Sequence, residues 1–262
     1  MKGREFLRLI DEHRQSTTIP GFRRERTIET CRQIDAEGVH SIVLHSRLLP
    51  ADADRIIERE IGHFRSLGHS FEWKVFEHDT PADLRERLVA RGFMIEETQA
   101  VLALDLSETP APLLAPAVAD IRELKDPERL QDILEVWSRV WPEEDQSHWV
   151  RKIAKSMREQ PGSVTPWVAY VDGVPASTGR LNVAPGNAFG YLGGGATRTE
   201  FRGRGLYTDL LRVRVLEAIA RGLKFLVVDA RPMSRPILEK RGFLQVSSAY
   251  ACNWKMPRST SR

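Results

Sequence analysis

The chain has 262 residues, of which 41% are hydrophobic and 29% are charged, so it can form a packed core and lacks the composition of a disordered protein. The 39 Lys and Arg residues nearly balance the 36 Asp and Glu residues, which excludes a chain whose whole surface serves nucleic acid. Two cysteines are too few for a disulfide scaffold, and no apolar stretch reaches the roughly 20 residues of a transmembrane helix. We expect a cytoplasmic globular protein with no membrane partner.

A series of elements in the first part of the chain recurs in the second part. In each copy a helical stretch ends at a glycine, Gly68 or Gly222, which we expect in the left-handed conformation. A strand-forming run follows, then a short helix ending in Arg-Gly-Phe, and then a last strand. These segments are 71–76, 88–93 and 100–106 in the first copy and 225–228, 238–243 and 250–255 in the second. The shared order favours a duplication.

The segment between the copies, residues 107–117, contains three prolines among alanines and small polar residues. Proline interrupts helices and central strands and favours extended backbone, so this segment is expected to be a linker rather than a loop within one domain. The predicted organisation is a first domain at 1–108, a linker at 109–118, a second domain at 119–256 and a disordered tail at 257–262.

A glycine-rich loop distinguishes the second copy from the first. Gly203 and Gly205 precede a predicted helix whose apolar face is formed by Leu211, Val215, Ala218 and Ile219. The first-turn amides of a helix lack intrahelical partners and carry partial positive charge, so a glycine loop that enters a helix can bind a pyrophosphate. Five arginines, at 198, 202, 204, 212 and 214, surround the loop and should attract a phosphorylated ligand.

The loop matches neither a Walker A motif, which needs G-x-x-x-x-G-K-[ST], nor a Rossmann fingerprint, which needs glycine where Thr208 stands. It resembles the acetyl-CoA loop of the GNAT acetyltransferases, [QR]-x-x-G-x-[GA], and residues 121–255 resemble a whole GNAT domain. In that resemblance, 167–176 is a hairpin, 191–197 the cofactor strand, 225–229 the next strand and 234–242 a short helix. The order of elements in 38–106 resembles a degenerate copy. The implied fold class is α/β (α+β), a mixed and mostly antiparallel sheet flanked by helices, in two tandem copies.

The resemblance implies residues that bind acetyl-CoA. Backbone groups of Gly195, Ala196 and Thr197 would hold the pantetheine arm and the thioester oxygen, and such amides stabilise an oxyanion. The residues implied at the pyrophosphate are Arg202, Gly203, Arg204, Gly205, Leu206, Tyr207 and Thr208. Tyr207 departs from the signature's Gly or Ala; it either covers the cofactor or packs.

The implied reaction is direct transfer of an acetyl group from acetyl-CoA to a primary amine of a small molecule or peptide, without a covalent enzyme intermediate. Leu238 stands where the family often has a tyrosine that protonates the thiolate, so Ser234, another hydroxyl or water would supply this proton. Ser234 is alternatively a helix cap. Glu200 and Asp229 are the carboxylates best placed to act as the general base.

Alternative functions remain open. The missing tyrosine also fits a non-catalytic acyl-CoA-binding or sensor protein, and the arginines of 198–214 fit a nucleic-acid-binding module, although no RNA-binding motif is present. Trp137, Trp141 and Trp149 form either core or an aromatic acceptor pocket. The histidines lack metal-ligand spacing, so no metal site is expected. The first domain is expected to shape the acceptor site or stabilise the second, and a homodimer is left open.

Overall fold

The computed structural model describes residues 3–19 and 21–257. The described residues fold into two compact units, the first formed by those up to 101 and from 246 onward and the second by residues 102–245. These units differ from the expected domains, because residues 102–108 lie in the second unit and residues 246–256 lie in the first. The predicted disordered tail lies, from residue 258 onward, outside the described residues. Within the described parts of the chain, no helix has the length and apolarity needed to cross a bilayer.

The first unit contains a mixed sheet with the strand order β1-β2-β3-β4-β12, and β5 pairs with β12. The strands β3 and β4 are parallel, whereas β1 with β2, β2 with β3, and β4 with β12 are antiparallel. The elements are α1 (Gly3–Ser16), β1 (Phe22–Arg26), β2 (Thr30–Asp35), β3 (Ser41–Ser46), α2 (Ala53–Leu67), β4 (Phe71–Phe76), α3 (Leu84–Val89), β5 (Met94–Ile95) and β12 (Leu244–Trp254).

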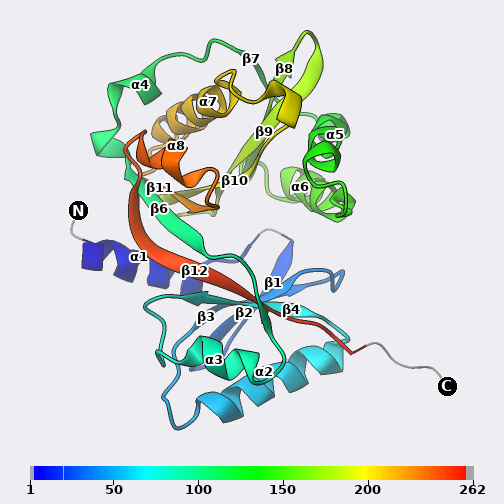
Figure 1. Cartoon of the computed structure of the whole chain (residues 1–262), viewed down its shortest axis with the longest axis vertical. Helices are drawn as coiled ribbons and strands as arrows, with labels where there is room; N and C mark the ends of the chain where they lie inside the picture. The colour runs from blue at the N-terminus through cyan, green and yellow to red at the C-terminus, as the bar shows by residue number, and fades with distance from the viewer. Residues whose placement is uncertain (1–2, 20, 258–262) are drawn as a thin grey trace, which may run out of the picture. The chain divides into compact units, whose positions relative to one another are not determined.

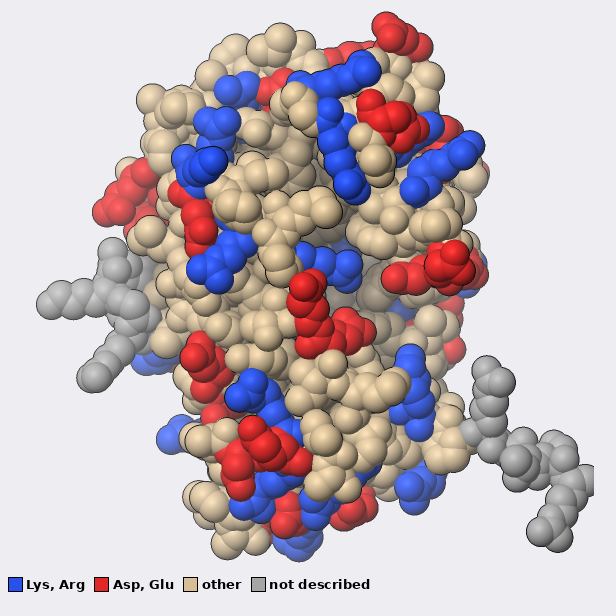
Figure 2. Space-filling model, viewed as in Figure 1, with Lys and Arg blue, Asp and Glu red and all other residues tan. Residues whose placement is uncertain are grey.

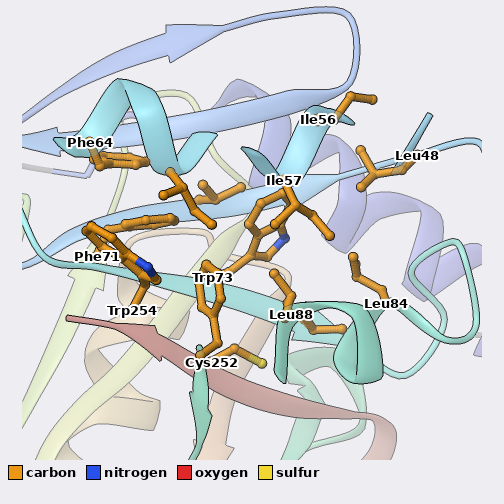
Figure 3. Close-up of a cluster of buried hydrophobic side chains, with 14 of the residues drawn as sticks. Leu48, Ile56, Ile57, Phe64, Phe71, Trp73, Leu84, Leu88, Cys252 and Trp254 are labelled. Atoms are coloured by element: carbon orange, nitrogen blue, oxygen red, sulfur yellow. The ribbon is translucent and has the colours of Figure 1, made fainter. Parts of the chain in front are cut away.

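The core of the first unit lies between its sheet and the helices α2 and α3 (Figure 3). Trp73 on β4 is fully buried at its centre, and its indole Nε1 donates to Ser46 Oγ at 3.0 Å. Ile57 of α2 and Leu88 of α3 point toward it, and Cys252 reaches it from β12. The C-terminal strand therefore completes a core that is otherwise built from residues before 102, which explains why residues 246–256 belong to this unit.

The second unit contains a mixed sheet with the strand order β6-β11-β10-β9-β8-β7. The strands β10 and β11 are parallel, and the pairs β7–β8, β8–β9 and β9–β10 are antiparallel. The elements are β6 (Gln99–Asp105), η1 (Leu106–Glu108), α4 (Ala111–Leu114), β7 (Asp120–Glu123), η2 (Pro127–Leu130), α5 (Gln131–Val140), α6 (Ser147–Glu159), β8 (Val164–Val171), β9 (Val174–Val183), β10 (Phe189–Thr197), η3 (Thr199–Phe201), α7 (Leu206–Ala220), β11 (Phe225–Ala230) and α8 (Arg235–Glu239).

Helices cover both faces of the second sheet (Figure 1). The helices α5 and α6 pack on one face, where Val136, Ile153 and Val168 share a core. The helix α7 packs on the other face, with Leu211, Val215 and Ala218 fully buried as expected. Ile219, predicted for the same apolar face, is instead 38% exposed, because it lies at the edge of the helix surface that meets the sheet.

The segment expected to be an extended linker packs on α7. It contains the short helix α4, which begins after the N-cap residue Pro110 and has Pro112 in its first turn, where proline is compatible with a helix. Leu113 is fully buried, and Arg212 Nε donates to the Pro112 carbonyl at 2.9 Å. Residues 111–114 of this segment are therefore helical rather than extended.

Gly68 and Gly222 have the predicted left-handed conformation, and a second pair of repeated glycines shares it. Gly68 and Gly222 follow α2 and α7 with φ values of 74° and 71°. Gly92 and Gly242 follow α3 and α8 with φ values of 83° and 90°. In all four turns the amide of the next residue closes the helix end, as Phe93 N does on Leu88 O at 3.2 Å. The repeated sequence segments therefore share the geometry of their helix ends.

Candidate functional site

The glycine loop of the second unit leads into the N-terminus of α7. Gly203 and Gly205 have φ values of 75° and 82°, which a side chain at either position would strain. A Cβ on either glycine would meet nothing within 4 Å, so the glycines are required for conformation rather than space. No side chain caps α7, and its first backbone bond runs from Asp209 N to Gly205 O at 3.0 Å. The amides at the start of this helix can therefore bind an anion, as predicted for the phosphate loop.

The expected cluster of five cooperating arginines is not present around this loop. Arg198 pairs with Glu200 at 2.8 Å and with Glu135 at 3.1 Å. Arg212 pairs with Asp209, and Arg214 is buried. Only Arg202 and Arg204 are exposed, and neither forms an ion pair within the described residues. Figure 2 shows Lys and Arg side chains interspersed with Asp and Glu on one face of the protein, without a continuous basic surface.

The strand β10 separates from β11 halfway along its length. The parallel pairing covers only Phe189–Tyr191, opposite Phe225–Val227. Past this point the antiparallel pairing with β9 is also interrupted, between Gly193 and Ala196, where Gly194 has a φ of 61°. The result is a fork between β10 and β11 in which the backbone of Gly195–Thr197 is not paired with β11.

Side chains from β9 fix the conformation of this irregular strand. Thr178 Oγ1 donates to the Gly194 carbonyl at 2.8 Å and accepts from Trp137 Nε1 at 3.0 Å. Ser177 Oγ donates to the Ala196 carbonyl at 2.8 Å. The backbone groups expected to hold the thioester are thus held rigidly, which is what preorganised stabilisation of an oxyanion requires.

Tyr207, in the first turn of α7, faces this strand. A Cβ on Gly195 would lie 3.2 Å from Cε2 of its ring, so the tyrosine packs directly against a residue expected to bind the thioester. Burial raises the pKa of the Tyr207 hydroxyl, while Arg214 and a hydrogen bond with Ser234 offset part of this effect. The phenol is therefore protonated at neutral pH. The sequence placed Tyr207 at the mouth of the loop but did not indicate that its hydroxyl reaches Ser234.

The predicted catalytic residues have different surroundings. Asp229 lies exposed on β11, two residues past the last residue paired with β10. Glu200 is held by Arg198, and a hydrogen bond to its own backbone amide, together with Arg198, lowers the pKa of its carboxyl, which weakens it as a base. Ser234 precedes α8 but makes no side-chain cap; its hydroxyl donates to the Arg231 carbonyl at 3.1 Å, so the capping interpretation is wrong. Leu238 is fully buried.

The tryptophans follow the core interpretation in part. Trp137 is buried and lies edge-on to Trp141, with ring centroids 6.2 Å apart, and Trp149 packs against the same cluster from α6. The helix α5 ends at Val140, just before Trp141 and Pro142, as expected from the proline. Trp137 nevertheless has a second contact, since a Cβ on Gly194 would lie 2.9 Å from its Cζ2.

A polar cluster in the first unit was not predicted. Asp11, His78 and Asp79 bring their ligand atoms within 4.8 Å of one another, a geometry that could hold a metal ion. Arg14, which is 2% exposed, donates to both Asp79 oxygens at 2.9 Å and to Asp11 at 3.0 Å. The guanidinium already neutralises these carboxylates, so the cluster is an arginine–carboxylate network.

Comparisons with known proteins agree with this geometry. A sequence model described as the Acetyltransferase (GNAT) family matches residues 130–243. No curated protein sequence matches the chain. A GCN5-related N-acetyltransferase from Kribbella flavida has a similar structure, with a TM-score of 0.69 and 16% identity, over 96% of this chain and 94% of that one.

Two further structures are similar over most of both chains. One is a GCN5-related N-acetyltransferase from Sphaerobacter thermophilus, with a TM-score of 0.60 and 14% identity over 89% of this chain and 79% of that one. The other is a tandem GNAT protein from the clavulanic acid biosynthesis pathway, with a TM-score of 0.57 and 17% identity over 98% of this chain and 95% of that one. At such identities these likenesses establish the fold, and the matched family model identifies residues 130–243, within the second unit, as an acetyltransferase domain of the GNAT family.

Proposed function

We propose that the second unit transfers an acetyl group from acetyl-CoA directly to a primary amine. The fork between β10 and β11 carries this proposal, because it leaves the backbone of Gly195–Thr197 beside the uncapped start of α7. The amides from Arg202 to Thr208 would hold the pyrophosphate, and the fork would hold the pantetheine arm. Acetyl-CoA supplies the activated thioester.

The chain's own residues have three tasks in this reaction. The amine must lose a proton before its nitrogen bonds to the acetyl carbon, and Asp229 is the carboxylate at the fork that can accept it. The backbone amides of the fork stabilise the oxyanion. When the carbon–sulfur bond breaks, the thiolate takes a proton, for which we infer that Tyr207 is the donor and Ser234 its hydrogen-bonding partner.

A calorimetric titration of acetyl-CoA into three proteins tests the cofactor site: the wild type, Gly205→Trp and Gly222→Trp. Gly222 is a matched control, because it also has a left-handed φ and open space but lies at the opposite end of α7. We expect the wild type and Gly222→Trp to bind acetyl-CoA and Gly205→Trp to lose binding. No binding by the wild type would contradict the proposal. Binding without turnover on any amine would leave a non-catalytic acyl-CoA-binding protein.

The role of Asp229 has a separate test. We expect Asp229→Asn to lower turnover while leaving the affinity for acetyl-CoA nearly unchanged, since a general base acts on the amine rather than on the cofactor. Unchanged turnover would remove Asp229 from the mechanism.

A further inference from the structure

Arg180 and Arg214 of the second unit are wholly or partly buried and have no carboxylate partner among the described residues. Arg214 on α7 is 2% exposed; its Nε donates to the Leu210 carbonyl at 2.8 Å, and its buried Nη2 has no hydrogen-bond partner in the described part of the chain. Arg180 on β9 is half-buried and forms neither a hydrogen bond nor an ion pair with any described residue. By contrast, the buried arginines Arg14, Arg32 and Arg198 all contact carboxylates.

Burying a guanidinium without an anion is unfavourable, because the charge loses its hydration and gains no compensating partner. Burial, together with the positive charge of Arg214, lowers the pKa of Arg180 to about 10. Burial also lowers the pKa of Arg214. A guanidinium nevertheless keeps its charge at neutral pH in a protein. This region therefore has two positive charges and no paired carboxylate among the residues that the structure describes.

Arg180 lies next to the irregular part of β10. A Cβ on Gly194 would lie 2.6 Å from Arg180 Nη1, and a Cβ on Gly193 would lie 3.3 Å from its Nε. These glycines therefore make room for the guanidinium. The guanidinium carbon also lies 5.6 Å from the centroid of the Trp137 ring, whose indole supports Thr178.

This position separates Arg180 from the phosphate loop. A Cβ on Gly194 would point toward Arg180 and Trp137 of the α5 side, whereas a Cβ on Gly195 would point toward Tyr207 of α7. The two residues thus present opposite faces of β10, and the start of α7, where a pyrophosphate would bind, lies on the Tyr207 side. An anion held by Arg180 would lie beside the acyl group and on the other face from the phosphates.

We propose that Arg180 binds a carboxylate of the acceptor, so that the substrates are amines that carry a carboxylate, such as amino acids. This proposal rests on the acetyl-transfer function proposed above. A guanidinium can bind a carboxylate through two parallel hydrogen bonds, which fixes the orientation of the acceptor as well as its affinity. Arg214 strengthens the local positive potential without contacting the acceptor.

The test compares matched acceptors on the full-length protein. Release of the CoA thiol is measured with a panel of amino acids and with their carboxamides, which differ only in the anionic group. The carboxamides have less basic amines and so more neutral nucleophile at pH 7, which biases the comparison against the proposal. We expect the wild type to favour carboxylates about 10- to 100-fold in kcat/KM, the loss typical of one charged hydrogen-bonded pair. Arg180→Gln should reduce this preference to within about threefold.

Two variants complete the design. Arg180→Lys keeps the charge but not the paired hydrogen bonds, and should retain part of the preference. Arg158→Gln changes an exposed arginine that pairs with Glu128 at 3.1 Å, and should behave as the wild type. Equal turnover of carboxamides by the wild type, or an undiminished preference in Arg180→Gln, would overturn the proposal.

A binding measurement covers the case in which no acceptor of the panel is acetylated. The same amino acids are titrated calorimetrically into the protein saturated with CoA, and we expect binding that Arg180→Gln loses. If acetyl-CoA binds but none of these amino acids does, the carboxylate proposal is wrong while the cofactor site stands. If acetyl-CoA itself does not bind, the proposed function fails first.

Discussion

The two units use the same arrangement of strands and a helix but fill it differently. In each unit two strands are parallel over three residue pairs and are connected by a long helix: β3, α2 and β4 in the first, β10, α7 and β11 in the second. In the first unit, Trp73 and Leu48 are buried at this place, and Trp73 bonds Ser46 at the end of β3. In the second unit the corresponding strands and helix, with the adjacent β9, carry glycines, Tyr207, Arg180 and Arg214 at this place instead of large apolar side chains.

This difference shows that the same arrangement of strands and helix can either be filled by a hydrophobic core or form a binding site. The turn between β3 and α2 has no glycine and contains the buried Leu48, whereas the turn before α7 has two left-handed glycines and exposed arginines. In the first unit, apolar side chains such as Trp73 and Leu48 fill the space beside these strands and stabilise the core. In the second unit, unpaired backbone groups and buried charges replace part of the apolar packing. This pattern is expected of functional sites.

Exchanging buried arginines for methionine gives the largest expected contrast between the units. Arg14→Met leaves Asp79, with a 3% exposed side chain, without its cation, and should destabilise the protein by about 3–5 kcal/mol. Arg214→Met removes a cation that has no anion, and should be neutral or stabilising by about 1 kcal/mol. Urea unfolding measures both. Similar losses of unfolding free energy in the two variants would show that an anion or water in solution compensates the charge of Arg214.

Removing the Tyr207 hydroxyl should affect only turnover. Tyr207→Phe keeps the ring against Gly195 but removes the proton donor, and should lower kcat about 100-fold while changing acetyl-CoA affinity by less than about threefold. Tyr250→Phe, on the C-terminal strand of the first unit, is the matched control and should retain full activity. A normal kcat in Tyr207→Phe would assign the proton to Ser234 or water.

Acidification should lower the stability of the first unit more than that of the second. Burial in the first unit, with a smaller contribution from Arg14, lowers the pKa of His45 to about 4, so the folded state holds His45 neutral while the unfolded state binds a proton below about 6.5. The stabilisation from His45 is present above pH 6.5 and is lost as the pH falls to about 4, with an effect on the order of 2 kcal/mol. His148 is the only histidine of the second unit and is half-buried. Hydrogen exchange should show the first unit opening earlier on acidification, and His45→Gln should reduce this difference.

The smallest expected difference in stability is between alanine substitutions of Gly92 and Gly242, which hold equivalent positions in the two units. Gly92→Ala places a Cβ in open space at a left-handed φ and should cost about 1 kcal/mol. Gly242→Ala has the same conformational cost, but its Cβ would lie 2.7 Å from Pro110 Cγ, so a total cost of about 2 kcal/mol is expected. Thermal unfolding compares the two variants. Equal costs would mean that the segment around Pro110 moves away easily.

Local features of the sequence predicted much of the fold. The four repeated glycines, the hairpin through Asp172 and Gly173, and the loop before α7 are governed by backbone conformation within a few residues, so their residue types are informative. The sequence did not predict which strands pair with β6 and β12, because strand pairing depends on residues that are distant in the chain. The sequence also could not show that Arg198 and Arg212 are neutralised, or that Arg180 is not, since ion pairs form only after folding.

The position of the C-terminal strand has a consequence for synthesis of the protein on the ribosome. The first unit needs β12 beside β4, yet residues 246–254 of this strand are translated after the second unit. The edge of β4 and the apolar side chains around Trp73 therefore stay uncovered while the second unit emerges and folds. An unpaired strand edge of this kind attracts other chains, so nascent molecules depend on chaperones or on rapid completion to reach the native state.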